Sequence, residues 1–184
     1  MRWQALFADL EGQLAEEAAA DLRAEVSDRT RREAARVGTI DKLRAAVGQP
    51  LTVAVSGGAR VQGTLVEAGP DWLLLEETAP RDLLIPLSAV LTIGGLGSRA
   101  ASPGSEGEVA RRLDLRWALR GLARSRLGLS VLLTDGSSLE GTLDRVGADY
   151  VDIAEHPVGE PRRPGVVRSV RLVPLTALNL LRSG

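Results

Sequence analysis

Apolar and polar residues alternate with a period of two in the stretch 48–95 of the chain. This alternation is typical of strands that are buried on one face. The stretch contains five apolar runs, Leu51–Val55, Val61–Leu65, Leu73–Leu75, Leu83–Pro86 and Val90–Ile93. Ser56-Gly57-Gly58 separates the first two runs and has the composition of a tight turn. We predict five short strands here, the fourth closed by Pro86, because proline cannot donate a hydrogen bond into a strand ladder.

The same pattern returns further along the chain. The segment VAVSGGARVQGTLVEAGPDWLLLEE at 53–77 aligns without a gap on VLLTDGSSLEGTLDRVGADYVDIAE at 131–155. The alignment superposes three glycines of each segment and places Trp72 on Tyr150. After an expanded hairpin at 156–165, rich in proline and arginine, the run 85–90 matches 173–178. We therefore predict a second five-stranded unit at 126–184.

The first 47 residues have a helical period instead. The apolar positions recur every three or four residues and are Trp3, Leu6, Phe7, Leu10, Leu14, Ala18, Leu22 and Val26. Such a stripe predicts a long amphipathic helical arm over 1–47. Acidic residues dominate 9–28 and basic residues 29–44, an order that suits the helix dipole. The stripe must pack either on the strand units of its own chain or on a second copy of the arm.

A linker and a second helix separate the two strand units. Residues 96–106 are mostly small residues and are predicted to form a flexible linker. Residues 107–125 have helical character and a strongly positive charge. Their arginines are Arg111, Arg112, Arg116, Arg120 and Arg124, and Arg126 follows directly.

The second unit carries a sequence motif. An apolar strand runs into Asp135-Gly136, then Leu139-Glu-Gly141-Thr-Leu143 follows, and a loop at Gly147 leads into a third strand. This motif resembles the first motif of the Sm-like domain, the family of Sm, LSm and Hfq proteins. The first unit is similar to it more weakly, with Gly57-Gly58 in place of Asp135-Gly136. The resemblance implies a mainly β, α+β chain with two tandem five-stranded Sm-like small barrels.

Members of that family bind single-stranded RNA. The resemblance places Trp72 and Tyr150 where the family stacks a base. Leu74 and Asp152, or Leu73 and Val151 in the ungapped alignment, stand where the family has an asparagine. The family's Arg-Gly pair is replaced by proline and leucine in both units. The resemblance therefore supports the fold more than the nucleotide pocket.

The family also forms rings, in which the fourth strand of one barrel pairs with the fifth strand of the next. The resemblance accordingly implies self-association through strand edges.

Composition narrows the chemistry. The chain has no cysteine and a single histidine, His156, which we interpret as a surface residue without a role. No catalytic, metal, cofactor or small-molecule site is predicted, because neither a nucleophile with its base nor a ligand spacing is present. The longest apolar runs are far shorter than the roughly 20 residues of a membrane helix. We expect a cytoplasmic protein that does not enter a membrane.

Two functions remain as hypotheses. The first is a non-enzymatic interaction or assembly module that associates with itself or with a protein partner. The alternative is a transcriptional or post-transcriptional regulator that binds nucleic acid, RNA rather than DNA. Because the net charge is −1, such binding needs a local basic surface. Its candidate residues are Trp72, Tyr150, Asp152, Arg111, Arg112, Arg116, Arg120, Arg124, and Arg162 and Arg163 of the expanded hairpin. A third possibility is that the acidic stretch 9–28 docks on the basic helix, within the chain or between chains. Such docking would hide the charge of the basic helix from nucleic acid and make both features part of an assembly contact.

Overall fold

A computed structural model describes residues 16, 21–77, 81–105, 107–157, 159, 163 and 165–183. The chain divides into two units, Met1–Gly38 and Thr39–Gly184. In the first unit a helix spans 21–34, and Leu22 and Val26 of the apolar stripe are 62% and 57% exposed. The predicted stripe from Trp3 to Ala18 lies outside the described residues. The predicted helical arm over 1–47 is interrupted in its described part, because the helical backbone stops before Gly38, and glycine is a weak helix former.

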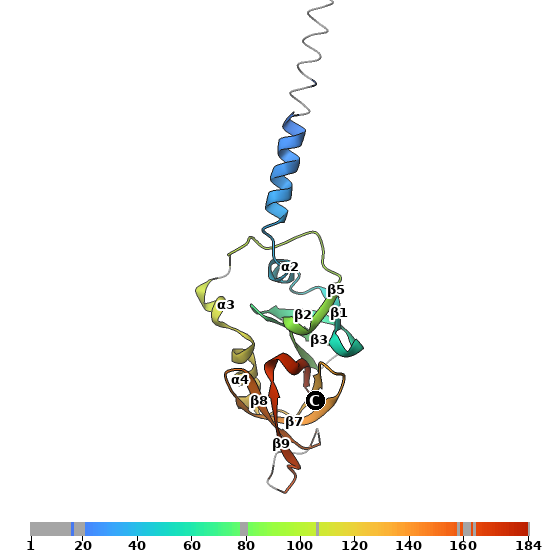
Figure 1. The fold of residues 1–184 in the computed structure, drawn as a ribbon, viewed down its shortest axis with the longest axis vertical. Coiled ribbons are helices and arrows are strands. Elements are labelled where there is room, and N and C mark those ends of the chain that lie inside the picture. Colours follow the sequence, from blue (N-terminus) through green and yellow to red (C-terminus); the bar gives the residue numbers. More distant parts are fainter. Residues whose placement is uncertain are drawn as a thin grey trace, which may run out of the picture. The chain divides into compact units, whose positions relative to one another are not determined.

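The second unit is an α+β fold built on one ten-stranded antiparallel sheet (Figure 1). The strands follow the order β5-β1-β2-β3-β4-β10-β6-β7-β8-β9. The first five are β1 (Pro50–Val55), β2 (Arg60–Ala68), β3 (Trp72–Glu76), β4 (Asp82–Pro86) and β5 (Val90–Gly94). The second five are β6 (Leu129–Leu133), β7 (Ser138–Val146), β8 (Tyr150–Glu155), β9 (Ser169–Pro174) and β10 (Leu178–Ser183). The strands sit where the alternation predicted them, and β4 ends at Pro86 as predicted.

The prediction of two small closed barrels is corrected by this topology. The sheet does not close, and its two halves are joined edge to edge by β4 and β10. Leu84 stands opposite Leu181 and Leu83 opposite Arg182 across this junction. The sequence pattern of each half is the same whether its outer strands stay free or pair with the other half, so it did not reveal the junction.

The internal repeat is present in the backbone as well as in the sequence. In each half the third strand pairs with the fourth in the same register, with Leu74 opposite Leu84 and Asp152 opposite Leu172. The bent second strand of each half needs its glycine. A Cβ at Gly63 would lie 2.6 Å from the Glu76 carbonyl oxygen, and one at Gly141 would overlap the Ala154 carbonyl. These glycines hold the second and third strands at close approach.

Short helices flank the sheet. They are α2 (Thr39–Ala45), α3 (Glu108–Arg112) and α4 (Leu115–Ser125) (Figure 1). The helix predicted at 107–125 is therefore interrupted at Leu113 and Asp114, and Asp114 caps α4 by accepting a hydrogen bond from the Trp117 amide at 2.9 Å. Leu43 of α2 and Leu119 of α4 are both fully buried, each in the core of its own half. No helix in the described part of the chain is long and apolar enough to cross a membrane.

The two cores exchange residues across the β4–β10 junction. Trp72 and Leu84 belong to the first half by sequence, yet they are buried in the core of the second half. Leu180 of β10 is buried in the core of the first half. The halves therefore complete each other's hydrophobic cores and form one packed unit.

Polar groups also cross the junction. Arg182 Nη2 donates to Glu77 Oε1 at 3.1 Å, and the Asp82 amide donates to Ser183 Oγ at 2.9 Å. Asn179, which is fully buried, donates from its side-chain amide to the Ser56 carbonyl. These bonds fix how β10 sits against the first half, because a displaced strand would leave buried polar groups unpaired.

Candidate interaction surface

Among the described residues, the two outer strands of the sheet, β5 and β9, each have one edge that pairs with no other strand. Both present apolar side chains to solvent. Leu91 of β5 is 66% exposed, and Val170 and Leu172 of β9 are 57% and 61% exposed. Exposed edge strands usually carry charges or irregularities that prevent pairing with another chain. Apolar side chains on both edges instead favour a partner strand.

Strand β9 is held in place by its inner neighbour. Glu155 of β8 accepts hydrogen bonds from Ser169 Oγ and, at 2.9 Å, from Arg171 Nε. The bond from Ser169 and then that from Arg171 lower the pKa of the Glu155 carboxyl from its ordinary value. The charged end of Arg171 is therefore directed at its own sheet, and Val170 and Leu172 are the apolar groups that the edge offers.

The repeat relates this free edge to the β4–β10 junction. Leu172 occupies in the second half the position of Leu84 in the first, because each stands opposite the same residue position of the third strand. Leu84 is 4% exposed because β10 covers it, whereas Leu172 is 61% exposed. On the partner side, Ile93 of β5 occupies the position of Leu181 of β10, since both pair with the matching valine of the first strand of their half.

A second contact accompanies the junction at the turn between β2 and β3. The indole Nε1 of Trp72 donates to the Leu113 carbonyl at 2.8 Å, and the Leu115 amide donates to Asp71 Oδ1 at 2.7 Å. Trp72 is only 2% exposed. The prediction that Trp72 belongs to a nucleic-acid surface is wrong, because the segment leading into α4 covers its ring and no base can stack on it.

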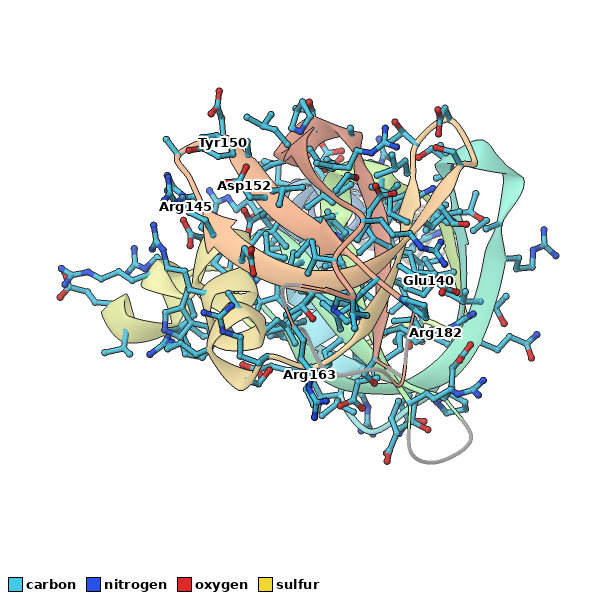
Figure 2. All side chains as sticks on the ribbon, turned by 90° about the horizontal axis from the view of Figure 1, so that it is seen from below. Glu140, Arg145, Tyr150, Asp152, Arg163 and Arg182 are labelled. Carbon is cyan, nitrogen blue, oxygen red and sulfur yellow. The ribbon has the colours of Figure 1, made fainter. Side chains whose placement is uncertain are left out.

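The matching turn of the second half, before β8, is open. Tyr150 is half-buried and Asp149 is exposed. Figure 2 shows Tyr150 near Asp152 and Arg145, at the same end of β7 and β8. The backbone of the two turns is the same, since the Leu87 amide donates to the Asp71 carbonyl at 2.9 Å and the Leu175 amide to the Asp149 carbonyl at 2.8 Å. The two turns therefore have the same backbone and differ in whether the segment leading into α4 packs over their aromatic residue.

The predicted arginines come from three parts of the chain. Arg111 and Arg112 lie on α3, and Arg116, Arg120 and Arg124 on α4, all exposed. Arg162 lies outside the described residues, and Arg163 is exposed. Arg120 and Arg124 line a hollow of about 660 Å³ with Arg126, which follows α4, and with Arg145, which sequence reasoning did not select for the site. Asp152 lines an adjoining hollow that Arg126 and Arg145 share.

Carboxylates partly neutralise these arginines. Arg126 Nη1 lies 3.1 Å from Asp144 Oδ1, and Arg116 Nη2 lies 2.7 Å from Asp114 Oδ2. Partial burial alone would raise the pKa of Asp114. The hydrogen bonds from Arg116 and the Trp117 amide, with the charges of Arg116 and Arg120, outweigh burial and lower it. The hollow lined by Arg120, Arg124, Arg126 and Arg145 therefore carries less net positive charge than its arginines alone would give.

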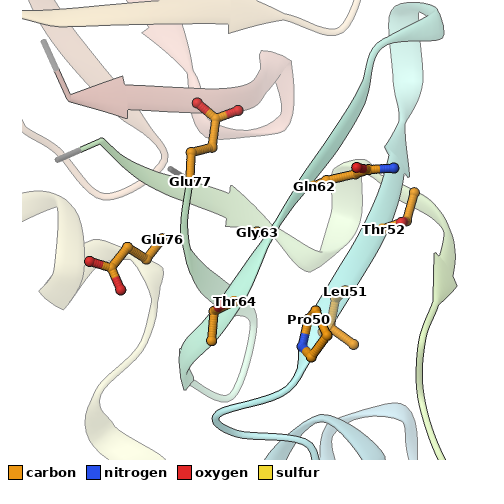
Figure 3. A pocket seen from close by; sticks show the side chains of 8 residues that line it. All are labelled: Pro50, Leu51, Thr52, Gln62, Gly63, Thr64, Glu76 and Glu77. Atoms are coloured by element: carbon orange, nitrogen blue, oxygen red, sulfur yellow. The ribbon is translucent and has the colours of Figure 1, made fainter. Parts of the chain in front are cut away.

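A further hollow of about 370 Å³ lies over β1, β2 and β3 (Figure 3). Its lining includes Glu76 and Glu77, whose carboxylates point apart in Figure 3. Glu77 already accepts a hydrogen bond from Arg182. Among the described residues, no group of three or more His, Asp or Glu side chains is placed to hold a metal ion.

His156 is not a surface residue, so that prediction is wrong. Its side chain is 2% exposed, with Nε2 2.6 Å from Thr142 Oγ1 and Nδ1 3.0 Å from the Pro157 carbonyl oxygen. Because a carbonyl oxygen only accepts, Nδ1 carries the proton, and Nε2 accepts from the Thr142 hydroxyl. A histidine at a strand end beside a proline gave no sequence signal of this pairing.

Comparison with known proteins adds no relative: no protein-family model matches the chain, and no curated protein matches its sequence.

Proposed function

We propose that this protein is a non-enzymatic assembly module that associates head to tail with copies of itself, β9 of one chain pairing with β5 of the next. The observation that carries the proposal is the contrast between Leu84 and its repeat equivalent Leu172. The same position is covered once within the chain and left exposed once. A second copy supplies the missing cover.

The strand order supports the proposal. Each half runs fifth-first-second-third-fourth, so β4 and β9 are equivalent, as are β10 and β5. The within-chain junction is a fourth strand paired with a fifth, which is how Sm-like domains associate. This likeness, with the glycine motif, favours an Sm-like assignment for each half.

The equivalence gives the register of the proposed contact. Leu84 opposite Leu181 becomes Leu172 opposite Ile93 of the next chain, and Leu83 opposite Arg182 becomes Arg171 opposite Gly94. Leu172 would then pack against the first core of the neighbour, as Leu84 packs in the second core of its own chain. The contact joins two different surfaces, so it is repeated by every added chain and produces a ring or a filament.

The molar mass in solution, measured by light scattering over a concentration series, tests the proposal. We expect species larger than one chain. Leu172→Lys should lower the association constant at least tenfold, about 1.4 kcal/mol, because it places an ammonium group in an apolar contact. Val66→Lys is the matched control, since Val66 is also exposed (45%) but lies on β2 inside the sheet. A wild-type mass equal to one chain at all concentrations would sink the proposal.

Cysteine pairing tests the register, because the natural chain has no cysteine. Chains carrying Leu172→Cys under one tag and Ile93→Cys under another are mixed and oxidised. Residues directly opposite in an antiparallel pair have Cα atoms about 4.5–5.5 Å apart, within disulfide range. A disulfide between the two tags is expected. When the second chain carries Val66→Cys in place of Ile93→Cys, this disulfide should not form.

The second candidate function, RNA binding, rests on the hollow lined by Arg120, Arg124, Arg126 and Arg145. Such a surface would retain short single-stranded RNA at low salt and release it as salt rises, because binding releases condensed counterions. Filter retention across a salt series, comparing wild type with Arg124→Glu, separates this function from assembly. Retention that is absent at low salt, or unchanged at high salt, excludes it.

A further inference from the structure

We propose that Asp149 and Tyr150 form a second docking point for the next copy of the chain and receive the segment around Thr39 that leads into α2. This inference rests on the proposed head-to-tail assembly and names contacts beyond the strand edges. It is drawn from a pair of contacts that the chain already makes once with its own residues.

The template is the turn before β3. There the Leu115 amide donates to Asp71 Oδ1 at 2.7 Å, while the Trp72 indole donates to the Leu113 carbonyl at 2.8 Å. One turn thus holds the neighbouring segment by an acceptor and a donor. The segment belongs to the same half that supplies β10 to the β4–β10 junction. Strand pairing and this docking point therefore act on the same neighbour.

The turn before β8 repeats the template in detail. The Gly69 amide donates to the Trp72 carbonyl at 2.9 Å, and the Gly147 amide to the Tyr150 carbonyl at 2.8 Å. In both turns the aromatic ring lies on the glycine, where a Cβ would overlap it. Tyr150 and Asp149 are therefore held like Trp72 and Asp71. The tyrosine hydroxyl offers a donor in place of the indole N–H.

The segment leading into α2 has the same place in the first half as the docking segment has in the second, because α2 precedes β1 and packs on β2, and α4 precedes β6 and packs on β7. Leu43 of α2 and Leu119 of α4 are both fully buried in the core of their own half, and both stand four residues after the first residue of their helix. These first residues are Thr39 and Leu115. Leu115 is 6% exposed and lies in the same buried cluster as Trp72, whereas Thr39 is exposed. The chain thus contains one turn, Asp71–Trp72, on which the segment at Leu115 is docked. It also contains a matching turn, Asp149–Tyr150, and a matching segment at Thr39.

In the assembly, the neighbour that places β5 on β9 also brings its Thr39 to Asp149. The Thr39 amide donates to the Asp149 carboxylate, as the Leu115 amide does to Asp71. The Tyr150 hydroxyl takes part in the same contact, beside Thr39. The partner is therefore a second copy of this chain, and Tyr150 is a protein contact and not a stacking platform for a base.

Crosslinking between tagged full-length chains tests the docking point. One chain carries Asp149→Cys and the other Thr39→Cys, and a short bismaleimide joins thiols that come close. The edge pair Leu172→Cys and Ile93→Cys is run in parallel. Crosslinks in both pairs support the proposal. An edge crosslink without the Asp149–Thr39 crosslink overturns it and leaves the edge assembly standing. No crosslink in either pair, with a mass of one chain, overturns both.

Variants at Tyr150 give an independent readout. Tyr150→Phe keeps the ring on Gly147 and removes only the hydroxyl. It should weaken association about fivefold, and Tyr150→Ala should weaken it at least tenfold, with the circular dichroism melt checked for each. If Tyr150→Phe and Tyr150→Ala both associate like the wild type, the docking point is refuted. Loss of RNA retention with unchanged association would refute it too, and would assign Tyr150 to nucleic acid.

Discussion

Gly57 stands against Gly136 across the two halves of the protein, so closely that a Cβ at Gly57 would lie 3.0 Å from the Gly136 amide nitrogen. Gly57 has a φ of 69° and Gly58 a φ of 82°, so both prefer glycine for their backbone conformation. Only Gly57 faces the other half, since nothing lies within 4 Å of a Cβ at Gly58.

Gly57→Ala should therefore destabilise the fold more than Gly58→Ala. Both variants carry the strain of a left-handed alanine, of roughly 1 kcal/mol. Gly57→Ala adds an overpacking cost of about 1–3 kcal/mol at the junction. Urea unfolding of both variants measures the difference in the free energy of unfolding. Equal costs would mean that the halves do not meet at these turns.

Trp72 and Tyr150 occupy the same place in the two halves and should respond differently to the same change. Trp72→Phe removes a buried hydrogen bond to Leu113 and leaves that carbonyl without its donor, at a cost of about 1–3 kcal/mol. Tyr150→Phe should change the free energy of unfolding by less than about 0.5 kcal/mol. Both are measured at a protein concentration low enough to suppress association. Similar losses would show that Tyr150 is already engaged within the chain.

The cap of α4 predicts a pH dependence. The lowered pKa of Asp114 means that its carboxylate is favoured in the folded state. Its contribution to stability is fully present above the ordinary aspartate pKa of about 3.9 and is lost as the pH falls through the lowered folded pKa. Asp114→Ala should cost about 0.5–2 kcal/mol at pH 7.

Asp114→Asn is the matched control for that variant, because it keeps an acceptor for the Trp117 amide but has no charge. The stability gap between wild type and Asp114→Asn should be largest near neutral pH and should narrow in acid. Chemical unfolding at several pH values measures this gap. A gap that is constant down to pH 3 contradicts the assignment.

The Thr142–His156 pair predicts a cost for losing a single hydroxyl. Thr142→Val keeps the shape of the side chain but leaves His156 Nε2 as a buried acceptor without its donor, at about 1–3 kcal/mol. Thr142→Ser retains the hydroxyl and should cost less. Thermal and urea unfolding compare the two. If serine is as damaging as valine, the lost methyl group and not the hydrogen bond dominates.

The local sequence pattern predicted those features of the fold that depend on residues close together in the chain. The alternation placed all the strands, Pro86 ended its strand, and Gly63 and Gly141 marked the bent strands, because each of these depends on neighbours in sequence. The pairing of β4 with β10 depends on residues about a hundred positions apart, and an edge strand reads the same whether it is paired or free.

The predicted site residues also differ in whether distant parts of the chain decide their exposure. Tyr150 and Asp152 lie at an accessible end of β8, and Arg120 and Arg124 line a hollow with Arg126 and Arg145. Trp72 has the same sequence context as Tyr150 but is buried, because a segment more than forty residues later in the chain covers it. Only the tertiary structure distinguishes the two aromatic residues. The repeat alignment was the signal that paired them.

Asn179 and its repeat equivalent on β5 are different residues, and this difference separates the stability of one chain from its association with other chains. Its buried amide binds Ser56 across the within-chain junction, whereas the same position on β5 is the exposed Leu91. A change at Leu91 therefore leaves the polar bond that joins the two halves untouched. The stability of one chain and the strength of its association with others can accordingly be tuned by different residues, so mutation can make the assembly looser or tighter without loss of the fold.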